Sequence, residues 1–270
     1  MTAPTAETAE PRRAWEAWRD AHHARIADPH GFLAVTALHW LSEEPQRLSG
    51  APGVWSTGPD GVTVALDDGE EIFVDGKPVR GVHHFGVIPE RVSVTALWGE
   101  AAIEVAKRGG RDIVRPRHPD NPLRLAFEGT PGYDFDPRWV VTGRYVAFDA
   151  PRPTTVGAAV EGLEHVYDAV GRIEFEIDGT PLALTAFDSG RTGNLLVLFT
   201  DETSGVTTYA ANRTLHVPAP EPGGTVVLDF NRAANLPCAY TDLATCPLPP
   251  AENRLPVAVE AGQKIPYERA

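Results

Sequence analysis

Residues 166–187 read VYDAVGRIEFEIDGTPLALTAF. Apolar and polar side chains alternate before Asp178-Gly179, in RIEFEI at 172–177, as is typical of a strand with one buried face, and the run PLALTAF that follows at 181–187 is mostly apolar, as in a buried strand. An Asp-Gly pair between two such runs favours a tight hairpin turn. The stretch therefore predicts strands at 166–178 and 181–187 and indicates a mostly β protein.

Further strand-like runs lie on either side of this hairpin, at residues 138–148, 194–200 and 206–209, with a turn at Ser204-Gly205. Antiparallel strands that follow one another must protect their edges, and a sheet does so by closing or by packing as a sandwich. We expect a larger antiparallel sheet, barrel-like or sandwich-like, in a C-terminal β domain over residues 116–270.

The first 115 residues are predicted to form helices and a β lobe that is smaller than the C-terminal β domain. Residues 1–45 indicate a disordered tail followed by short helices, the first beginning near Pro11. The run FLAVTALHWL at 32–41 is apolar nearly all round, which favours a buried helix and leaves a strand open. Residues 46–115 predict a small β lobe of hairpins. Its turn dipeptides are Asp60-Gly61, Asp75-Gly76 and Gly109-Gly110.

Charge and hydropathy restrict the partners. The chain has 24 Lys and Arg residues against 37 Asp and Glu, so its net charge is -13. A field of this sign repels phosphate backbones and anionic membrane surfaces. The first residues lack the apolar core of a signal peptide, and no run approaches the roughly 18 apolar residues of a membrane span. We expect a cytoplasmic protein without nucleic-acid or membrane partners.

Polar side chains crowd the C-terminal third. Strand-like runs at 225–230 and 256–260 flank a proline-rich loop that is dense in Asp, Asn, Arg and Glu. If neighbouring strands carry them, these side chains converge at one end of the sheet, where ligand sites commonly form. The candidates for ligand binding are Asp201, Thr207, Tyr209, Arg213, Asn231 and Asn253, and the candidates for acid or base are Asp229 and Glu260.

Structural interpretations of the same residues remain open. Residues 201–205 also suit a local turn, because Asp, Thr, Ser and Gly stabilise turns by short-range hydrogen bonds. Arg213 with Asp229 or Glu260 suits a structural ion pair as well as a ligand clamp.

The two cysteines, Cys238 and Cys246, are separated by seven residues, unlike the tight pair that begins most zinc sites. They are weak candidates for metal ligands or for a disulfide, and packed thiols are the favoured interpretation. The sequence leaves the identity of any cofactor unknown.

Three ordered motifs carry a resemblance. They read LLVLFTDETSGVTTY at 195–209, LDFNRAANLPCAY at 228–240 and CPLPPAENRLPVAVEAGQK at 246–264. Together they resemble the bacterial domain-of-unknown-function family 1684, which implies one shared architecture and no assigned activity. The positions that match its motif residues are Asp201, Thr203, Ser204, Gly205, Thr207, Tyr209, Arg213, Asp229, Asn231, Cys238, Tyr240, Cys246 and Asn253, and the resemblance adds Tyr240 to the ligand-binding candidates.

The chain also departs from the family pattern. Ala211 and Asn212 stand where glycine-rich backbone is expected, Ala234 and Leu236 replace an expected Tyr and Pro, and Gln263 replaces an expected Glu. An acid or base at that last position would be missing from this member.

The leading hypothesis is a β-rich protein that binds, and in one version transforms, a small polar or anionic molecule at the C-terminal motif cluster. Arg213 is the expected charge partner, and Asn231 and Asn253 are expected to fix the ligand's orientation. The alternative is a structural or protein-interaction module whose N-terminal lobe docks a protein partner. A third hypothesis is metal or redox chemistry at the cysteine pair.

Overall fold

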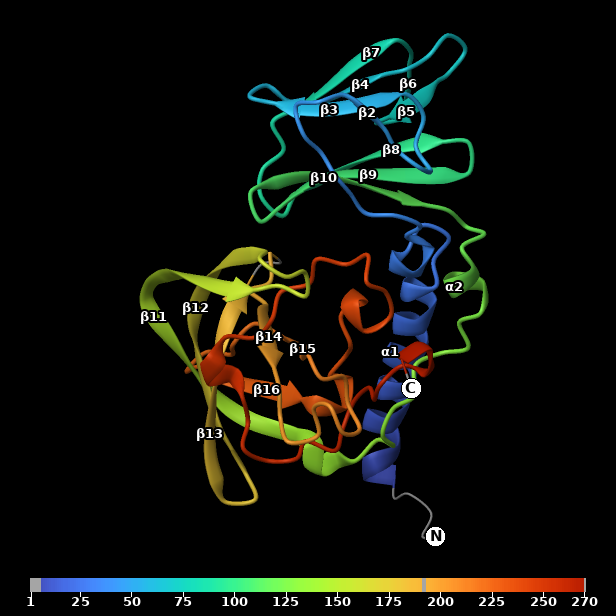
Figure 1. Ribbon diagram of the computed structural model, residues 1–270. Coiled ribbons are helices and arrows are strands. Elements are labelled where there is room, and N and C mark those ends of the chain that lie inside the picture. Colours follow the sequence, from blue (N-terminus) through green and yellow to red (C-terminus); the bar gives the residue numbers. More distant parts are fainter. Residues whose placement is uncertain (1–5, 191–192, 270) are drawn as a thin grey trace. The chain divides into compact units, whose positions relative to one another are not determined.

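The computed structural model describes residues 6–190 and 193–269 and shows a mostly β protein, as the sequence predicted (Figure 1). The chain divides into two compact units. One consists of residues 24–128, and the other combines the chain up to His23 with everything from Gly129 onward.

Helix α1 (Ala6–Ile26) begins five residues before Pro11, where the sequence placed its start. Pro11 lies inside the helix.

The run at 32–41 does not form the buried helix that its apolar character favoured. It contains a single 3₁₀ turn (Phe32–Ala34) and the two-residue strand β1 (His39–Trp40). The backbone N–H groups of Thr36 and Leu41 donate to the carbonyls of Pro116 and Asp112, so pairing with a distant strand replaces local helical hydrogen bonds.

The unit of residues 24–128 contains two antiparallel sheets. The four-stranded sheet has the order β2-β3-β4-β7, and the six-stranded sheet has the order β1-β10-β9-β8-β5-β6. All three predicted turn dipeptides join paired strands. The bounds are β2 (Gln46–Arg47), β3 (Val54–Gly58), β4 (Gly61–Ala65), β5 (Ile72–Val74), β6 (Lys77–Val79), β7 (Val82–Gly86), β8 (Ser93–Trp98), β9 (Ala101–Arg108), β10 (Arg111–Arg117) and the short helix α2 (Pro122–Leu125).

The other unit is built on one six-stranded antiparallel sheet with the order β15-β14-β13-β12-β11-β16. The two end strands, β15 and β16, also contact each other, so the sheet curls into a half-barrel (Figure 1). This confirms the barrel-like prediction. The bounds are β11 (Val140–Gly157), β12 (Glu164–Ile177), β13 (Thr180–Asp188), β14 (Leu195–Phe199), β15 (Arg213–Val217) and β16 (Thr225–Asp229).

The hairpin predicted at Asp178-Gly179 joins β12 to β13. Asp178 has φ 49° and Gly179 has φ 78°, so both turn residues are left-handed, and Ile177 pairs directly with Thr180. Ile173 and Leu184 pair in the same ladder and are fully buried, so the alternating pattern points its apolar face into the core.

In the unit of the half-barrel, two of the predicted strands are absent from the described residues, and one strand was not predicted. Residues 206–209 form a turn, because the carbonyl of Thr203 accepts hydrogen bonds from three successive amides that follow it. Residues 256–260 are irregular, with the amide of Val259 bonded to a side chain rather than to a neighbouring strand. The strand β15 was missed.

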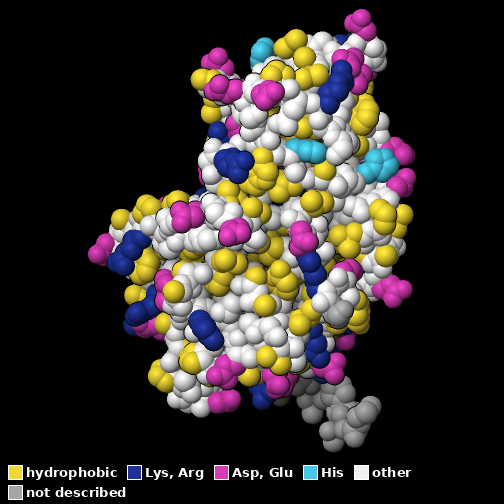
Figure 2. All heavy atoms as spheres, viewed as in Figure 1, with side chains coloured by type: hydrophobic (Ala, Val, Ile, Leu, Met, Phe, Trp, Pro, Cys, Tyr) yellow, Lys and Arg dark blue, Asp and Glu magenta, His cyan; other side chains and the backbone are white. Residues whose placement is uncertain are grey.

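On the face drawn in Figure 2, acidic side chains are scattered among apolar and basic ones. The negative charge of the chain is therefore spread over that face rather than gathered into one patch.

Candidate functional site

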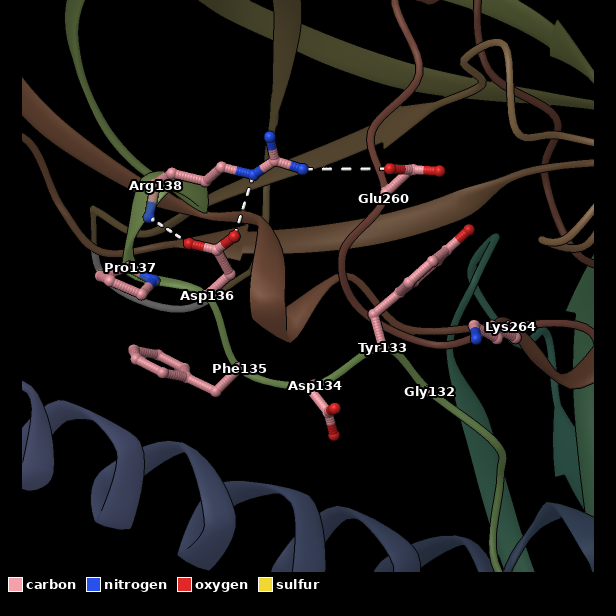
Figure 3. A pocket seen from close by; sticks show the side chains of 9 residues that line it. All are labelled: Gly132, Tyr133, Asp134, Phe135, Asp136, Pro137, Arg138, Glu260 and Lys264. Carbon is pink, nitrogen blue, oxygen red and sulfur yellow. Dashed lines mark hydrogen bonds and ion pairs between the residues drawn. The ribbon is translucent and has the colours of Figure 1, made fainter. Parts of the chain in front are cut away.

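An open pocket with a volume of about 510 Å³ lies in the unit that contains the half-barrel (Figure 3). We call it the Lys264 pocket. It is lined by residues 132–138, which read GYDFDPR, together with Glu260 and Lys264. Pockets of this size suit small molecules.

The floor of the pocket consists of two chain segments that pair antiparallel. Gly132 bridges to Gln263, the amide of Tyr133 donates to the Gly262 carbonyl at 2.9 Å, and the amide of Lys264 donates to the Pro131 carbonyl at 2.9 Å. Gly262 has φ 75°, and a Cβ there would lie 2.4 Å from the carbonyl oxygen of Ala233. Only glycine fits this position, because both the φ angle and the space exclude a side chain.

Asn231 holds the loop of the pocket. Its side-chain oxygen accepts from the Asp136 amide and its side-chain nitrogen donates to the Asp136 carbonyl, each at 3.0 Å. The backbone carbonyl of Asn231 accepts from the Trp15 indole at 2.8 Å, and that indole packs against Phe135 with ring centroids 5.9 Å apart. Helix α1 and Asn231 together therefore fix residues 135–136.

A buried ion pair lies behind Glu260. The Arg213 guanidinium and the Asp201 carboxylate are 2.6 Å apart, and both side chains are 0% exposed. Arg213 also donates to the carbonyls of Val259, at 3.0 Å, and Ala261. Burial lowers the pKa of Arg213, while the charge of Asp201 acts in the opposite direction. The pair therefore fixes the backbone on both sides of Glu260.

Asp201 also fixes the turn that follows β14. Its Oδ1 accepts from the amide and the hydroxyl of Thr203, at 2.7 and 2.6 Å, and from the Val259 amide at 3.3 Å. This arrangement combines the local turn and the structural ion pair that the sequence left open, with Asp201 in place of Asp229 or Glu260 as the partner of Arg213.

The exposed side chains of the pocket carry both signs of charge. Arg138 is 2.9 Å from the Asp136 carboxylate and 3.9 Å from the Glu260 carboxylate. The Lys264 ammonium lies 4.3 Å from the centre of the Tyr133 ring, and Figure 3 shows that ring between Glu260 and Lys264. Within the described part of the chain, Lys264 has no carboxylate in ion-pair range, so it is the cation of the pocket whose charge no carboxylate neutralises.

Among the predicted site residues, Glu260 alone lines the pocket. Thr207 touches it indirectly, because its hydroxyl lies 2.6 Å from the Tyr133 hydroxyl. Asp229 caps the 3₁₀ turn Phe230–Arg232 and pairs with Arg232 at 3.0 Å. The structure therefore places Asp229 outside the pocket.

The remaining predicted residues bond within the fold. Asn253 joins β13 to β14, since its side chain bonds the amide and carbonyl of Thr185 and the carbonyl of Leu198. The Tyr209 hydroxyl donates to the Cys238 carbonyl at 2.9 Å. The Tyr240 hydroxyl lies 2.6 Å from that of Thr130, and burial raises the pKa of Tyr240 to about 12.

Sequence reasoning missed most of the pocket itself. The missed residues are Tyr133, Asp134, Asp136, Arg138 and Lys264. Two signals were available. The run GYDFDPR alternates charged and aromatic residues, and Lys264 is one of only three lysines in the chain and lies in the third motif.

One group of possible metal ligands occurs among the described residues, in the unit of residues 24–128. Ligand atoms of Glu100, His118 and Asp120 lie within 4.8 Å of one another. Cys238 and Cys246 are buried thiols that form no disulfide and lie outside this group. No helix in the described part of the chain has the length and apolar character to cross a membrane.

Comparison with known proteins places the chain in a family. A family model described as a protein of unknown function, DUF1684, matches residues 125–264. A solution NMR structure of an uncharacterized protein from Haloarcula marismortui is 32% identical, with 52% of this chain and 78% of that chain covered and a TM-score of 0.45. No curated protein matches. The match of the family model contains the three motifs and the whole Lys264 pocket, and the chain therefore belongs to the DUF1684 family.

Proposed function

We propose that the protein binds a small polar molecule with an anionic group in the Lys264 pocket. The sequence assigned the role of charge partner to Arg213. The proposal transfers this role to Lys264, because Arg213 is fully buried and its guanidinium already bonds Asp201 and two backbone carbonyls.

The support comes from the backbone groups to which the buried polar side chains of the motifs bond, because these groups belong to the lining of the pocket. Arg213 bonds the backbone beside Glu260, and Asn231 bonds the backbone of Asp136. Burying an ion pair removes two charges from water, and the attraction between them often fails to recover that cost. A buried pair that adds little stability still fixes geometry, and the geometry that it fixes here is the wall of an open pocket.

The lining suggests the chemistry of the ligand. Lys264 is available to an anionic group, such as a carboxylate or a phosphate, beside the ring of Tyr133. Asp134 and Glu260 offer acceptors for hydroxyl or ammonium groups of the same molecule. The positive charge of Arg138 is already compensated by the carboxylates of Asp136 and Glu260. A ligand with both an anionic group and hydrogen-bond donors fits this set, and Glu260 is also placed to serve as an acid or base on it.

The first experiment is native mass spectrometry of the purified, untagged protein, compared with its denatured mass. It is followed by thermal-shift measurements with a panel of amino acids, dicarboxylates and sugar phosphates. We expect at least one compound to raise the Tm of the wild type. Lys264→Met should remove that shift and Glu260→Gln should reduce it, while both variants keep the Tm of the unliganded protein.

The matched control is Lys77→Met, which removes an exposed lysine of β6 in the other unit. It should leave the ligand-induced shift unchanged. A shift that survives in Lys264→Met would place the ligand elsewhere.

A second candidate function is a structural or interaction module. It is favoured by the side chains of Asn253 and Arg213, which bond backbone groups inside the fold rather than facing a cavity. A bare polypeptide mass, together with no response to any compound of the panel, would support this candidate over ligand binding.

A further inference from the structure

Cys238 and Cys246 meet in a small buried cluster that the proposed binding function does not use. The backbone N–H of Cys238 donates to the Cys246 sulfur at 3.3 Å, and the two thiols are hydrogen-bonded to each other. They pack with Ala244, Tyr209 and Leu236. Thiols in contact are the starting geometry for a disulfide, which the spacing of seven residues in the sequence does not guarantee.

The fold fixes both cysteines in this contact. Cys238 lies in the 3₁₀ turn Pro237–Ala239, which the Tyr240 amide closes by donating to Pro237. On the other side, the carbonyl of Cys246 accepts from Ala159 at 2.8 Å. The carbonyl of Thr245 also lies 2.6 Å from the ring of His165. The cysteines are therefore held by separate backbone contacts rather than by a flexible loop.

The surroundings of Cys238 favour its thiolate. The hydrogen bond from Cys246 lowers the pKa of Cys238, burial opposes this, and the nearby charge of Arg269 adds to the lowering, so the net direction is downward. Arg269 is itself held by Asp242 at 2.6 Å. The thiolate is the form of cysteine that reacts with oxidants, so Cys238 is the residue of the pair that reacts first.

We propose that Cys238 and Cys246 form a reversible thiol–disulfide site that hydrogen peroxide oxidises. The Cys238 thiolate attacks one peroxide oxygen, the O–O bond breaks, and the products are a sulfenic acid and hydroxide. The Cys246 sulfur then attacks the Cys238 sulfur, the S–O bond breaks, and the Cys246 proton leaves with the oxygen as water. In total, two thiols and one peroxide give one disulfide and two waters.

The burial of the two thiols limits the size of the oxidant that can reach them. Cys238 is 4% exposed and Cys246 is 7% exposed, so a bulky disulfide such as oxidised glutathione meets a barrier that hydrogen peroxide does not. The contact between the thiols also means that the sulfenic acid has a partner beside it as soon as it forms.

The experiment treats the full, folded chain with hydrogen peroxide and follows its intact mass and its free thiols. We expect loss of the mass of two hydrogen atoms and of both thiols, with full recovery in dithiothreitol. Cys246→Ser should instead gain oxygen at Cys238 and react with dimedone, a probe for sulfenic acid. The variant Cys238→Ser/Cys246→Ser is the control, because it reports any oxygen added at Met1, the only methionine.

A second measurement does not depend on how the variants fold. The thiol–disulfide equilibrium of the wild type is measured against a dithiothreitol redox buffer in the folded state and in urea. We expect the equilibrium constant for disulfide formation to be at least about tenfold larger in the folded protein, which corresponds to about 30 mV. An equal or smaller constant in the folded protein would overturn the proposal, as would folded wild type that gains oxygen without losing hydrogen.

Discussion

Arg213 donates hydrogen bonds to the backbone carbonyls on both sides of Glu260, at Val259 and Ala261. The buried cation and the exposed carboxylate thus belong to one arrangement, in which Arg213 sets the position of Glu260 without touching its side chain. The consequences of this arrangement can be measured.

Arg213→Ala should lower the free energy of unfolding by about 3–5 kcal/mol, because it leaves the Asp201 carboxylate buried without its counter-ion. Urea unfolding provides the measurement. The matched control is Arg144→Ala, which breaks the surface pair with Glu174 and should cost far less, because surface ion pairs contribute little to stability. Equal losses in the two variants would contradict the structural role of the buried pair.

Asn231→Ala should loosen the pocket loop. The Asp136 amide loses its acceptor, and an unsatisfied amide in this half-buried position costs up to about 1–3 kcal/mol. Hydrogen exchange should show faster exchange at Asp136. In Asn194→Ala, which removes an exposed acceptor of the Ala219 amide, the exchange rate at Asp136 should not change.

Gly262→Ala tests the floor of the pocket. The added Cβ would meet the Ala233 carbonyl at 2.4 Å, whereas a Cβ at Gly76 meets nothing within 4 Å. The two glycines have φ of 75° and 72°, so their backbone strain is matched. Gly76→Ala should cost about 1 kcal/mol, and Gly262→Ala should cost clearly more. If calorimetry gave equal losses, steric exclusion at Gly262 would be refuted.

Glu104 gives the unit of residues 24–128 a dependence on pH. Burial alone would raise the pKa of this carboxyl, but the charges and hydrogen bonds of Arg115 and Arg117 lower it from 4.5 to about 2. Because the folded pKa lies below the unfolded one, the stabilisation is complete above about pH 4.5 and is lost as the pH falls toward 2. It amounts to about 3 kcal/mol.

Urea unfolding at neutral pH and at about pH 3 would measure this stabilisation. Between the two conditions, Glu104→Gln should lose less stability than the wild type. If both proteins declined in parallel, another carboxyl would be responsible.

The sequence predicted those parts of the fold that local chemistry decides. The turn at Asp178-Gly179 requires two residues that tolerate a left-handed backbone, and Asp and Gly are such residues. The alternation before the turn reflects a strand with one buried face. Both features can therefore be recognised from the sequence alone. The apolar run at 32–41 favoured a buried helix, and its periodicity alone left a strand open. Pairing with β10, which is about 75 residues away in the chain, decided its structure.

In the candidate site, too, the sequence predicted what depends on residue type and missed what depends on contacts between distant segments. The motifs pointed to Arg213 and Asn231 as polar residues with a role, and the structure shows both bonded to the backbone of one pocket. The sequence could not show that they face inward, because burial depends on which distant segments cover them. It also gave no reason to connect residues 132–138 with Lys264, since their pairing joins segments more than 120 residues apart.

The hydrogen bond from the Trp15 indole to the carbonyl of Asn231 has a consequence for how this protein is cut into pieces. The family match begins at residue 125. Trp15 of α1, which packs against Phe135 and donates a hydrogen bond to the Asn231 carbonyl, lies more than 100 residues earlier. A fragment trimmed to the match would expose an aromatic ring and leave a buried carbonyl unpaired. The span that is recognisable by sequence is thus smaller than the span that must be expressed together to obtain an intact pocket.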